Sequence, residues 1–150
     1  MSALNVFEAT PVISAAGIYA SGDAVGGLLT FENVCSAFTP SALLMAAVLI
    51  DRDKESDLLS LLLFDQAVTP TADNSPLDPT DADLAHLIAI VPFPAASYVD
   101  LNDNSACYVA TEIPVRLVDA GVNLYGLLVS GATPTYTAVD DLTVRLIVRS

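Results

Sequence analysis

The feature that most constrains the fold is a strict alternation of residue character near the C-terminal end of the sequence. Large aliphatic residues occupy every even position: Leu142, Val144, Leu146 and Val148. The odd positions between them hold Thr143, Arg145, Ile147 and Arg149. Successive side chains of a β-strand point to opposite faces of its sheet, so this pattern predicts a strand that packs one face on a core. The other face meets water or a partner.

Similar apolar or alternating segments recur along the chain. They are Leu28 to Val34, Leu43 to Asp51, Leu58 to Phe64, Leu87 to Phe93, Ala106 to Thr111, Pro114 to Val118 and Val122 to Val129. Their lengths and the short turns between them are typical of a sandwich of two antiparallel sheets. We therefore predict an all-β, jelly-roll-like antiparallel β-sandwich. Residues 16–150 form its single domain, and residues 1–15 form an N-terminal arm or an edge strand.

One short helix and one long loop interrupt the strands. Residues Asp81 to His86 favour a helix, with Thr80 as its N-cap and Asp83 as the acid of a capping-box-like start. The segment Gln66 to Thr80 is acidic, rich in Pro, Thr, Asp and Asn, and has no apolar period. It predicts a long loop that crosses between sheets or reaches toward a partner.

The charge balance and the hydropathy exclude two classes of partner. The net charge is −13, and the segment from Glu55 to Glu112 holds ten acids without Lys or Arg. Such a chain repels phosphate backbones, so we expect no nucleic-acid binding. The longest apolar run, Ala42 to Ile50, has nine residues, about half of what a membrane-spanning helix needs. We expect no membrane association and no secretion signal, because the N-terminus lacks a basic region.

The residues that could carry catalysis are few. His86 is the single histidine, and no Gly-x-Ser-x-Gly motif accompanies it, so we interpret it as a histidine at a helix end. Cys35 and Cys107 are 72 positions apart, too few and too widely spaced for a zinc site. We interpret them as buried thiols and leave open whether they pair. The sequence thus predicts no catalytic residue, no cofactor and no enzymatic activity.

Two groups of oxygen-bearing side chains could suggest calcium: Asp100 to Asn104, and Asp73 with Asn74 and Asp78. Neither matches an EF-hand loop, and Asp and Asn also cap turns through their own backbone. We favour turns, predict no metal site, and leave calcium open. The segment Gly22 to Gly27 lacks the lysine of a phosphate-binding loop, so its glycines predict a turn and a β-bulge.

Several short motifs occur in a recognisable order. They are Ile18 to Gly27 (IYASGDAVGG), Val48 to Asp51 (VLID), Leu61 to Asp65 (LLLFD), Thr71 to Asn74 (TADN), Leu124 to Val129 (LYGLLV) and Thr133 to Tyr136 (TPTY). In this order the sequence resembles capsid decoration, or cement, proteins of tailed bacteriophages. The resemblance covers most of residues 18–148. It implies a non-enzymatic virion protein that is made in the cytoplasm of a bacterial host. Such a protein binds the major capsid protein on the capsid exterior as a homotrimer and stabilises the capsid.

A protein of this kind would bind through surfaces rather than through a pocket. Two sets of residues are candidates for the interface: the apolar residues Leu4, Val6, Val12 and Ile13 of the N-terminal segment, and Arg145, Ile147 and Arg149 of the last strand. The two arginines could pair with acids of a neighbouring subunit. Outward apolar residues such as Ile147, Leu127 and Val129 could meet another subunit, or loops of the same chain could cover them.

The main alternative is a carbohydrate- or receptor-binding β-sandwich module of a virion or cell surface. Such modules stack sugars on exposed aromatic rings, and this chain has no Trp and five Tyr. A hydrolase of unfamiliar design is a third possibility, which the single histidine disfavours.

Overall fold

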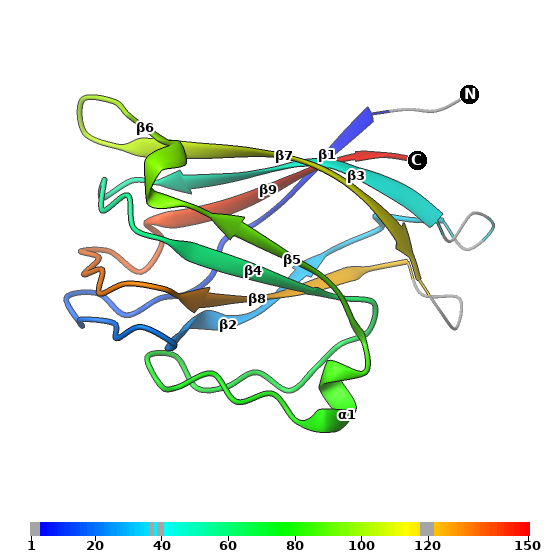
Figure 1. Ribbon diagram of the computed structural model, residues 1–150, viewed down its shortest axis with the longest axis horizontal. Coiled ribbons are helices and arrows are strands. Elements are labelled where there is room, and N and C mark those ends of the chain that lie inside the picture. The colour runs from blue at the N-terminus through cyan, green and yellow to red at the C-terminus, as the bar shows by residue number, and fades with distance from the viewer. Residues whose placement is uncertain (1–3, 37, 39–40, 118–121) are drawn as a thin grey trace.

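The computed structural model describes residues 4–36, 38, 41–117 and 122–150. In this part of the chain, two antiparallel sheets face each other (Figure 1). The five-stranded sheet has the order β1-β9-β3-β7-β6, with bounds Leu4–Ala9, Leu142–Arg149, Ser41–Asp51, Ser105–Arg116 and Tyr98–Asp100. The four-stranded sheet has the order β2-β8-β4-β5, with bounds Ala24–Phe31, Leu124–Ser130, Leu59–Phe64 and Leu87–Phe93. The prediction of a β-sandwich is confirmed.

The strand pairing is nested, which makes the sandwich a jelly roll. β1 pairs with β9, β2 with β8, β3 with β7, and β4 with β5, and all four pairs are antiparallel. The chain thus forms one long antiparallel ribbon that folds over itself, so that successive pairs lie alternately in the two sheets. The short strand β6 is an addition at the edge of β7.

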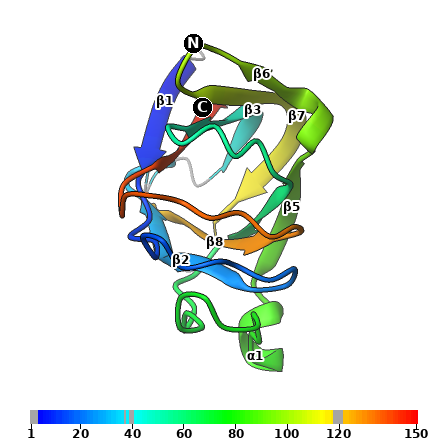
Figure 2. The same ribbon diagram turned by 90° about the vertical axis from the view of Figure 1, so that its left-hand side faces the viewer.

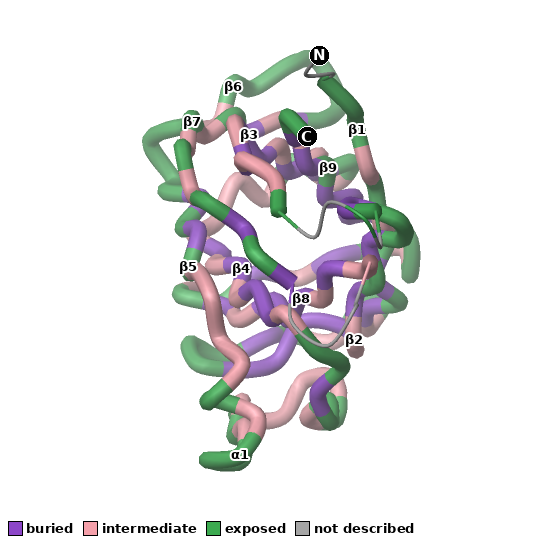
Figure 3. The backbone as a smooth tube through the Cα atoms, turned by 90° about the vertical axis from the view of Figure 1, so that its right-hand side faces the viewer, coloured by how far each residue is buried: buried purple, intermediate pink, exposed green. Residues whose placement is uncertain are grey.

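The core lies between the sheets and follows the alternation seen in the sequence. The even positions of β9 are all buried, and its two arginines are exposed. Large side chains from both sheets fill the core, among them Tyr19, Phe31, Phe93 and Tyr136, all 1% exposed or less. The rings of Tyr19 and Tyr136 meet edge to face with their centroids 6.0 Å apart. Exposed residues gather along the edge strands β1 and β6 (Figure 3).

Three strands differ from the sequence prediction. β7 is continuous from Ser105 to Arg116, where two separate segments were expected. Pro114 suggested a break, but it lies where β7 has a neighbour only on the β3 side, so its missing N–H is not needed there. β6 was missed because it has only three residues. β2 begins at Ala24 rather than at Leu28. Val118, the expected end of the Pro114 segment, lies outside the described residues.

The glycine-rich segment before β2 forms the predicted turn and bulge. Gly22 and Gly26 have φ angles of 95° and 76°, a region that residues with a Cβ seldom adopt. The register between β2 and β8 shifts between Val25 and Leu29. A Cβ on Gly26 would lie 2.6 Å from Pro11 Cβ, so glycine is required there for the close approach as well.

The helix forms where expected but is shorter. α1 spans Asp81–Leu84, and the Thr80 hydroxyl accepts the N–H of Asp83, as an N-cap does. The Asp83 carboxylate accepts the N–H of Thr69 instead of completing a capping box. One turn of 3-10 helix, Ala95–Ser97, leads into β6. No helix among the described residues has the length and apolarity to span a membrane.

Candidate docking surface on the five-stranded sheet

The outer face of the five-stranded sheet carries apolar side chains in adjacent rows. Val6 of β1 lies opposite Ile147 of β9. One row further, Arg145 of β9 lies opposite Val48 of β3, which lies opposite Tyr108 of β7. The next row runs through Thr143, Ile50, Ala106 and Val99. We call this surface the outer β3 face: Leu4, Val6, Leu43, Val48, Ile50, Val99, Tyr108 and Ile147.

Part of this face is strongly exposed. Val6, Val99 and Tyr108 keep 62%, 63% and 60% of their surface accessible. Val48, Ile50 and Ile147, nearer the middle of the sheet, are half-buried by their neighbours. Thr143, at one end of the face, is 2% exposed, and its hydroxyl bonds to the side chains of Thr10 and Arg52. The described backbone does not cross over the rest of this side of the sheet (Figures 1 and 2). An antiparallel sheet that faces water normally presents polar residues there.

The outer face of the four-stranded sheet is covered instead. Val68 and Leu77 of the loop between β4 and α1 pack against side chains from all four strands, and Phe64 and Leu127 become fully buried there. The remaining members of this second cluster are Leu28, Leu62, Leu87 and Tyr125. The loop and α1 lie beneath this sheet, on the side away from the other sheet (Figure 2). The predicted long loop thus folds back on its own domain.

Asp73 fixes this covering loop to the sandwich. Its carboxylate accepts the hydroxyl of Tyr19 at 2.7 Å, the N–H of Gly26 at 2.6 Å and the hydroxyl of Ser14. Burial and the nearby Asp73 carboxylate raise the pKa of Tyr19 to about 12, because both disfavour the phenolate. Backbone bonds between Asn74 and Ala24, and between Ser75 and Ala24, add the loop to the start of β2. The oxygen-rich group at Asp73 and Asn74 therefore has a structural role.

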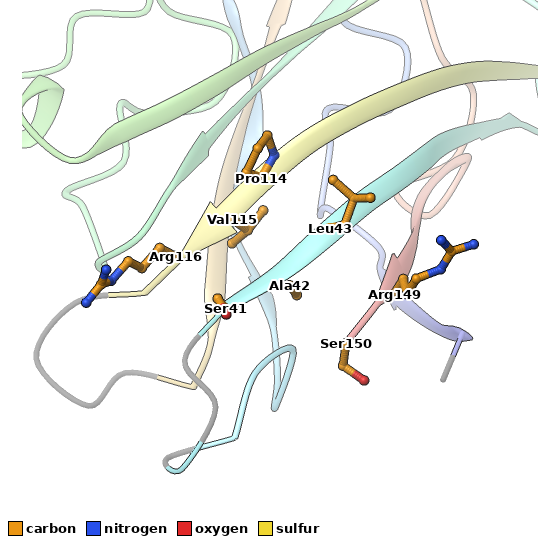
Figure 4. Close-up of a pocket in the computed structure, with 8 residues that line it drawn as sticks. All are labelled: Ser41, Ala42, Leu43, Pro114, Val115, Arg116, Arg149 and Ser150. Carbon is orange, nitrogen blue, oxygen red and sulfur yellow. The ribbon is translucent and has the colours of Figure 1, made fainter. Parts of the chain in front are cut away.

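Basic residues lie on and beside the outer β3 face. Arg145 Nε donates to Glu8 Oε2 of the adjacent strand at 2.9 Å, and both side chains are about half exposed. Arg145, which we expected to pair with an acid of a neighbouring subunit, therefore already has a partner in its own chain. Arg149 and Arg116 end β9 and β7 on either side of the first residues of β3 (Figure 4). Between them lies an open hollow of about 450 Å³, lined by Ser41, Ala42, Leu43, Pro114, Val115 and Ser150 besides the two arginines.

The structure divides the predicted interface residues into three groups. Leu4, Val6 and Ile147 lie on the outer β3 face, and the N-terminal segment that carries the first two is an edge strand. Val12 is 74% exposed but lies beyond the end of β1. Ile13 is 3% exposed and packs in the main core, so its side chain is not on a docking surface. Val99 was missed because it lies in the three-residue strand β6. Tyr108 was missed because it stands between Cys107 and Val109 in an apolar run, where no alternation marks the outward position.

The other candidate side chains are engaged within the fold. His86 immediately precedes β5, and its Nδ1 lies 3.0 Å from Asp65 Oδ1. Cys35 and Cys107 are both free and buried, and burial raises the pKa of both thiols. Asp100 accepts the hydroxyl of Ser56, which links two turns at one end of the sandwich. Within the described ranges, no three His, Cys, Asp or Glu side chains are grouped so as to hold a metal ion.

Asp51, at the end of β3, is the most buried acid of these turns. Its carboxylate accepts the N–H groups of Asp53 and Ser56 at 3.0 and 2.9 Å. Burial nevertheless raises its pKa, and burial also raises the pKa of Glu55 in the same turn. This end of the sandwich is therefore acidic and crowded with carboxylates.

Comparison with known proteins gives no family. No protein-family profile matches the chain, and no curated protein matches it. The chain is similar to one from a solved structure titled "Structure of a marine algae virus of the order Picornavirales", with 9% identity and a TM-score of 0.24. The match covers 97% of this chain and 66% of the other, so this chain spans slightly less than two thirds of the length of that one. A match at this level carries no argument about function, and the resemblance to phage decoration proteins stays a prediction.

Proposed function

We propose that the chain is a non-enzymatic structural protein of a virion. It binds the major capsid protein on the outside of a tailed-phage capsid as a homotrimer and stabilises the capsid. The observation that carries this proposal is the outer β3 face, an apolar surface that the described chain leaves uncovered. Exposed apolar patches of this kind mark interaction sites on soluble proteins.

Two further features support a structural role. The fold is a jelly roll, and such folds occur in viral coat proteins and in lectins. The order of the short motifs from Ile18 to Tyr136 resembles that of decoration proteins. Many copies on a lattice would each contribute a modest contact, and avidity would supply the rest of the affinity.

The direct test adds purified protein to emptied capsids of the virus that carries the gene and measures their melting temperature by calorimetry. We expect the wild-type protein to sediment with the capsids and to raise their melting temperature, because it binds only the intact shell. The variant Val6→Lys/Tyr108→Lys places two charges on the outer β3 face and should lose both effects. Light scattering of the free protein should give a trimer.

The matched control is Leu84→Lys/Ile90→Lys, which adds the same two charges at exposed apolar positions of α1 and β5. It should stabilise capsids like the wild type. Equal loss of binding by both variants, or no binding by the wild type, would contradict the proposal.

The second candidate function is carbohydrate binding, and one observation favours it. Tyr108 presents an exposed ring on the outer β3 face, and sugars stack on such rings. Glycan-array binding that is lost in Tyr108→Ala, together with no effect on capsids, would establish this alternative.

A further inference from the structure

The two ends of the five-stranded sheet carry opposite charge. At the end where β3 finishes, eight carboxylates surround two basic residues, Arg52 and Lys54; the acids are Asp51, Asp53, Glu55, Asp57, Asp100, Asp103, Asp140 and Asp141. At the other end, Arg116 and Arg149 flank the start of β3 (Figure 4). Neither arginine side chain has a hydrogen bond or ion pair to the described part of the chain.

The same two strands carry both sets of charges. β7 and β9 both run antiparallel to β3 and therefore parallel to each other. Asp103 precedes β7 and Arg116 ends it; Asp140 precedes β9 and Arg149 ends it. β7 and β9 are two strand spacings apart, about 9.6 Å, along the whole sheet. Each of these two strands thus has an acid in the turn before its first residue and an arginine at its last.

We propose that a second copy of this chain docks head to tail on this sheet. The acidic end of one copy meets the hollow between Arg116 and Arg149 of the next, so that Asp103 and Asp140 face the two arginines. The interface uses two different surfaces of the same molecule, so it is heterologous and closes into a ring when successive copies are suitably rotated. Of the outer β3 face it uses only Leu43, which also lines the hollow.

Side chains at both ends are suited to this contact. Asp103 and Asp140 are exposed, and the bonds to Asn102 and Asp140 from Lys54 and Arg52 go to backbone oxygens, not to carboxylates. The hollow adds apolar area from Leu43 and Pro114. Exposed ion pairs are weak and screened by salt, so the contact forms at low ionic strength or at the high local concentration of a lattice.

Sedimentation velocity of the purified full chain tests the proposal. At about 20 mM salt the wild-type mass should rise above the monomer mass of 15.6 kDa as concentration increases, and it should fall back at about 0.5 M salt. The variants Arg116→Glu/Arg149→Glu and Asp103→Lys/Asp140→Lys should each associate at least about tenfold more weakly. The first makes both ends acidic, and the second places lysines opposite the two arginines. A wild type that stays monomeric under all conditions would overturn the proposal.

Mixing the two variants gives the sharpest outcome. In the mixture, the glutamates of Arg116→Glu/Arg149→Glu can meet the lysines of Asp103→Lys/Asp140→Lys. An equimolar mixture should therefore regain a mass above that of either variant alone. The control Lys54→Glu/Arg145→Glu makes the same change in net charge as the arginine variant but leaves both arginines of the hollow in place. It should associate at least as tightly as the wild type, because Lys54→Glu makes the acidic end more acidic. Association by the arginine variant, or a monomeric mixture, would refute the contact.

This contact can fail independently of the proposed function. Loss of capsid binding by Val6→Lys/Tyr108→Lys, with unchanged association of the free protein, would support both proposals. If the arginine variant instead loses capsid binding while its self-association is unchanged, the hollow binds the capsid protein and the head-to-tail proposal is wrong. Circular dichroism and thermal melting of each variant establish that it is folded.

Discussion

The outer faces of the two sheets begin from the same sequence pattern and end differently. Leu127 of β8 and Ile147 of β9 are both aliphatic residues on outward positions of their strands. Leu127 is 3% exposed, because the loop between β4 and α1 covers it, whereas Ile147 remains half-buried on a surface that no described segment covers. Outward apolar residues therefore do not by themselves indicate an interface. The reach of the connecting loops decides which face becomes a second core and which stays available.

The largest expected effect compares one aromatic residue on each face. Phe64→Ala removes a fully buried ring from the covered face and should lower the free energy of unfolding by about 3–5 kcal/mol. Tyr108→Ala, on the outer β3 face, should change it by less than about 1 kcal/mol, because the ring is 60% exposed. Urea denaturation of both variants measures the difference. Equal losses would show that the two faces are packed alike.

The second prediction removes the attachment of the covering loop. Asp73→Ala deletes the acceptor of three donors and leaves the buried Tyr19 hydroxyl without it, which should cost about 2–3 kcal/mol. Amide exchange at Asn74 and Leu77 should accelerate first, since their N–H groups donate to Ala24, the first residue of β2, and to Gly22 in the turn before it. Asp78→Ala in the same loop, where no carboxylate bond is lost, is the control and should change stability little. Similar exchange in both variants would contradict this role of Asp73.

The third prediction concerns alkaline pH. The folded protein holds the Tyr19 proton up to a pKa of about 12, whereas the unfolded chain loses it near the ordinary tyrosine pKa of 10.0. Between these values the folded state binds more protons, so stability decreases as pH rises. Burial raises the pKa of Tyr98 and Tyr136 in the same direction. Urea midpoints measured from about pH 9 to about pH 12 should fall, and less steeply in Tyr19→Phe. A slope unchanged by that substitution would exclude Tyr19 as a contributor.

The smallest effect is expected on the outer β3 face. Glu8→Gln removes the ion pair with Arg145, in which both side chains are about half exposed. It should lower the free energy of unfolding by about 0–1 kcal/mol. The effect should shrink at high salt, because screening already weakens the pair in the wild type. Thermal melting at two salt concentrations measures it. A loss above about 2 kcal/mol would mean that the pair fixes β1 more strongly than an exposed pair can.

Periodicity in the sequence was sufficient to predict the sandwich, because most strands alternate or are continuously apolar. It was also sufficient for the N-cap at Thr80 and for the glycine turn and bulge before β2, since each needs only neighbouring residues. Strand β6 and the continuity of β7 through Pro114 depend on which strands are neighbours. That information comes from contacts between distant parts of the chain.

The candidate surface was predictable only in part for the same reason. Leu4, Val6, Val12 and Ile13 were expected on a surface as apolar residues of the N-terminal segment, and Ile147 because of its alternation. Ile13 instead belongs to the core. Its neighbour Val12 has the same character and is exposed, so composition could not separate them. The role of Asp73 depends on its contacts with Tyr19 and Gly26, which are 54 and 47 positions away.

The position of β9 has a consequence for how the protein is made. β9 is the last strand in the sequence, yet it lies between β1 and β3. Until residues 142–149 have left the ribosome, β1 therefore has no strand to pair with, and β3 has one unpaired edge. Folding must wait until synthesis reaches this strand, and pairing between such distant segments is slow, in the range of milliseconds to seconds. During that interval two apolar strands are open to aggregation, so we expect yield to depend on chaperones and on synthesis rate.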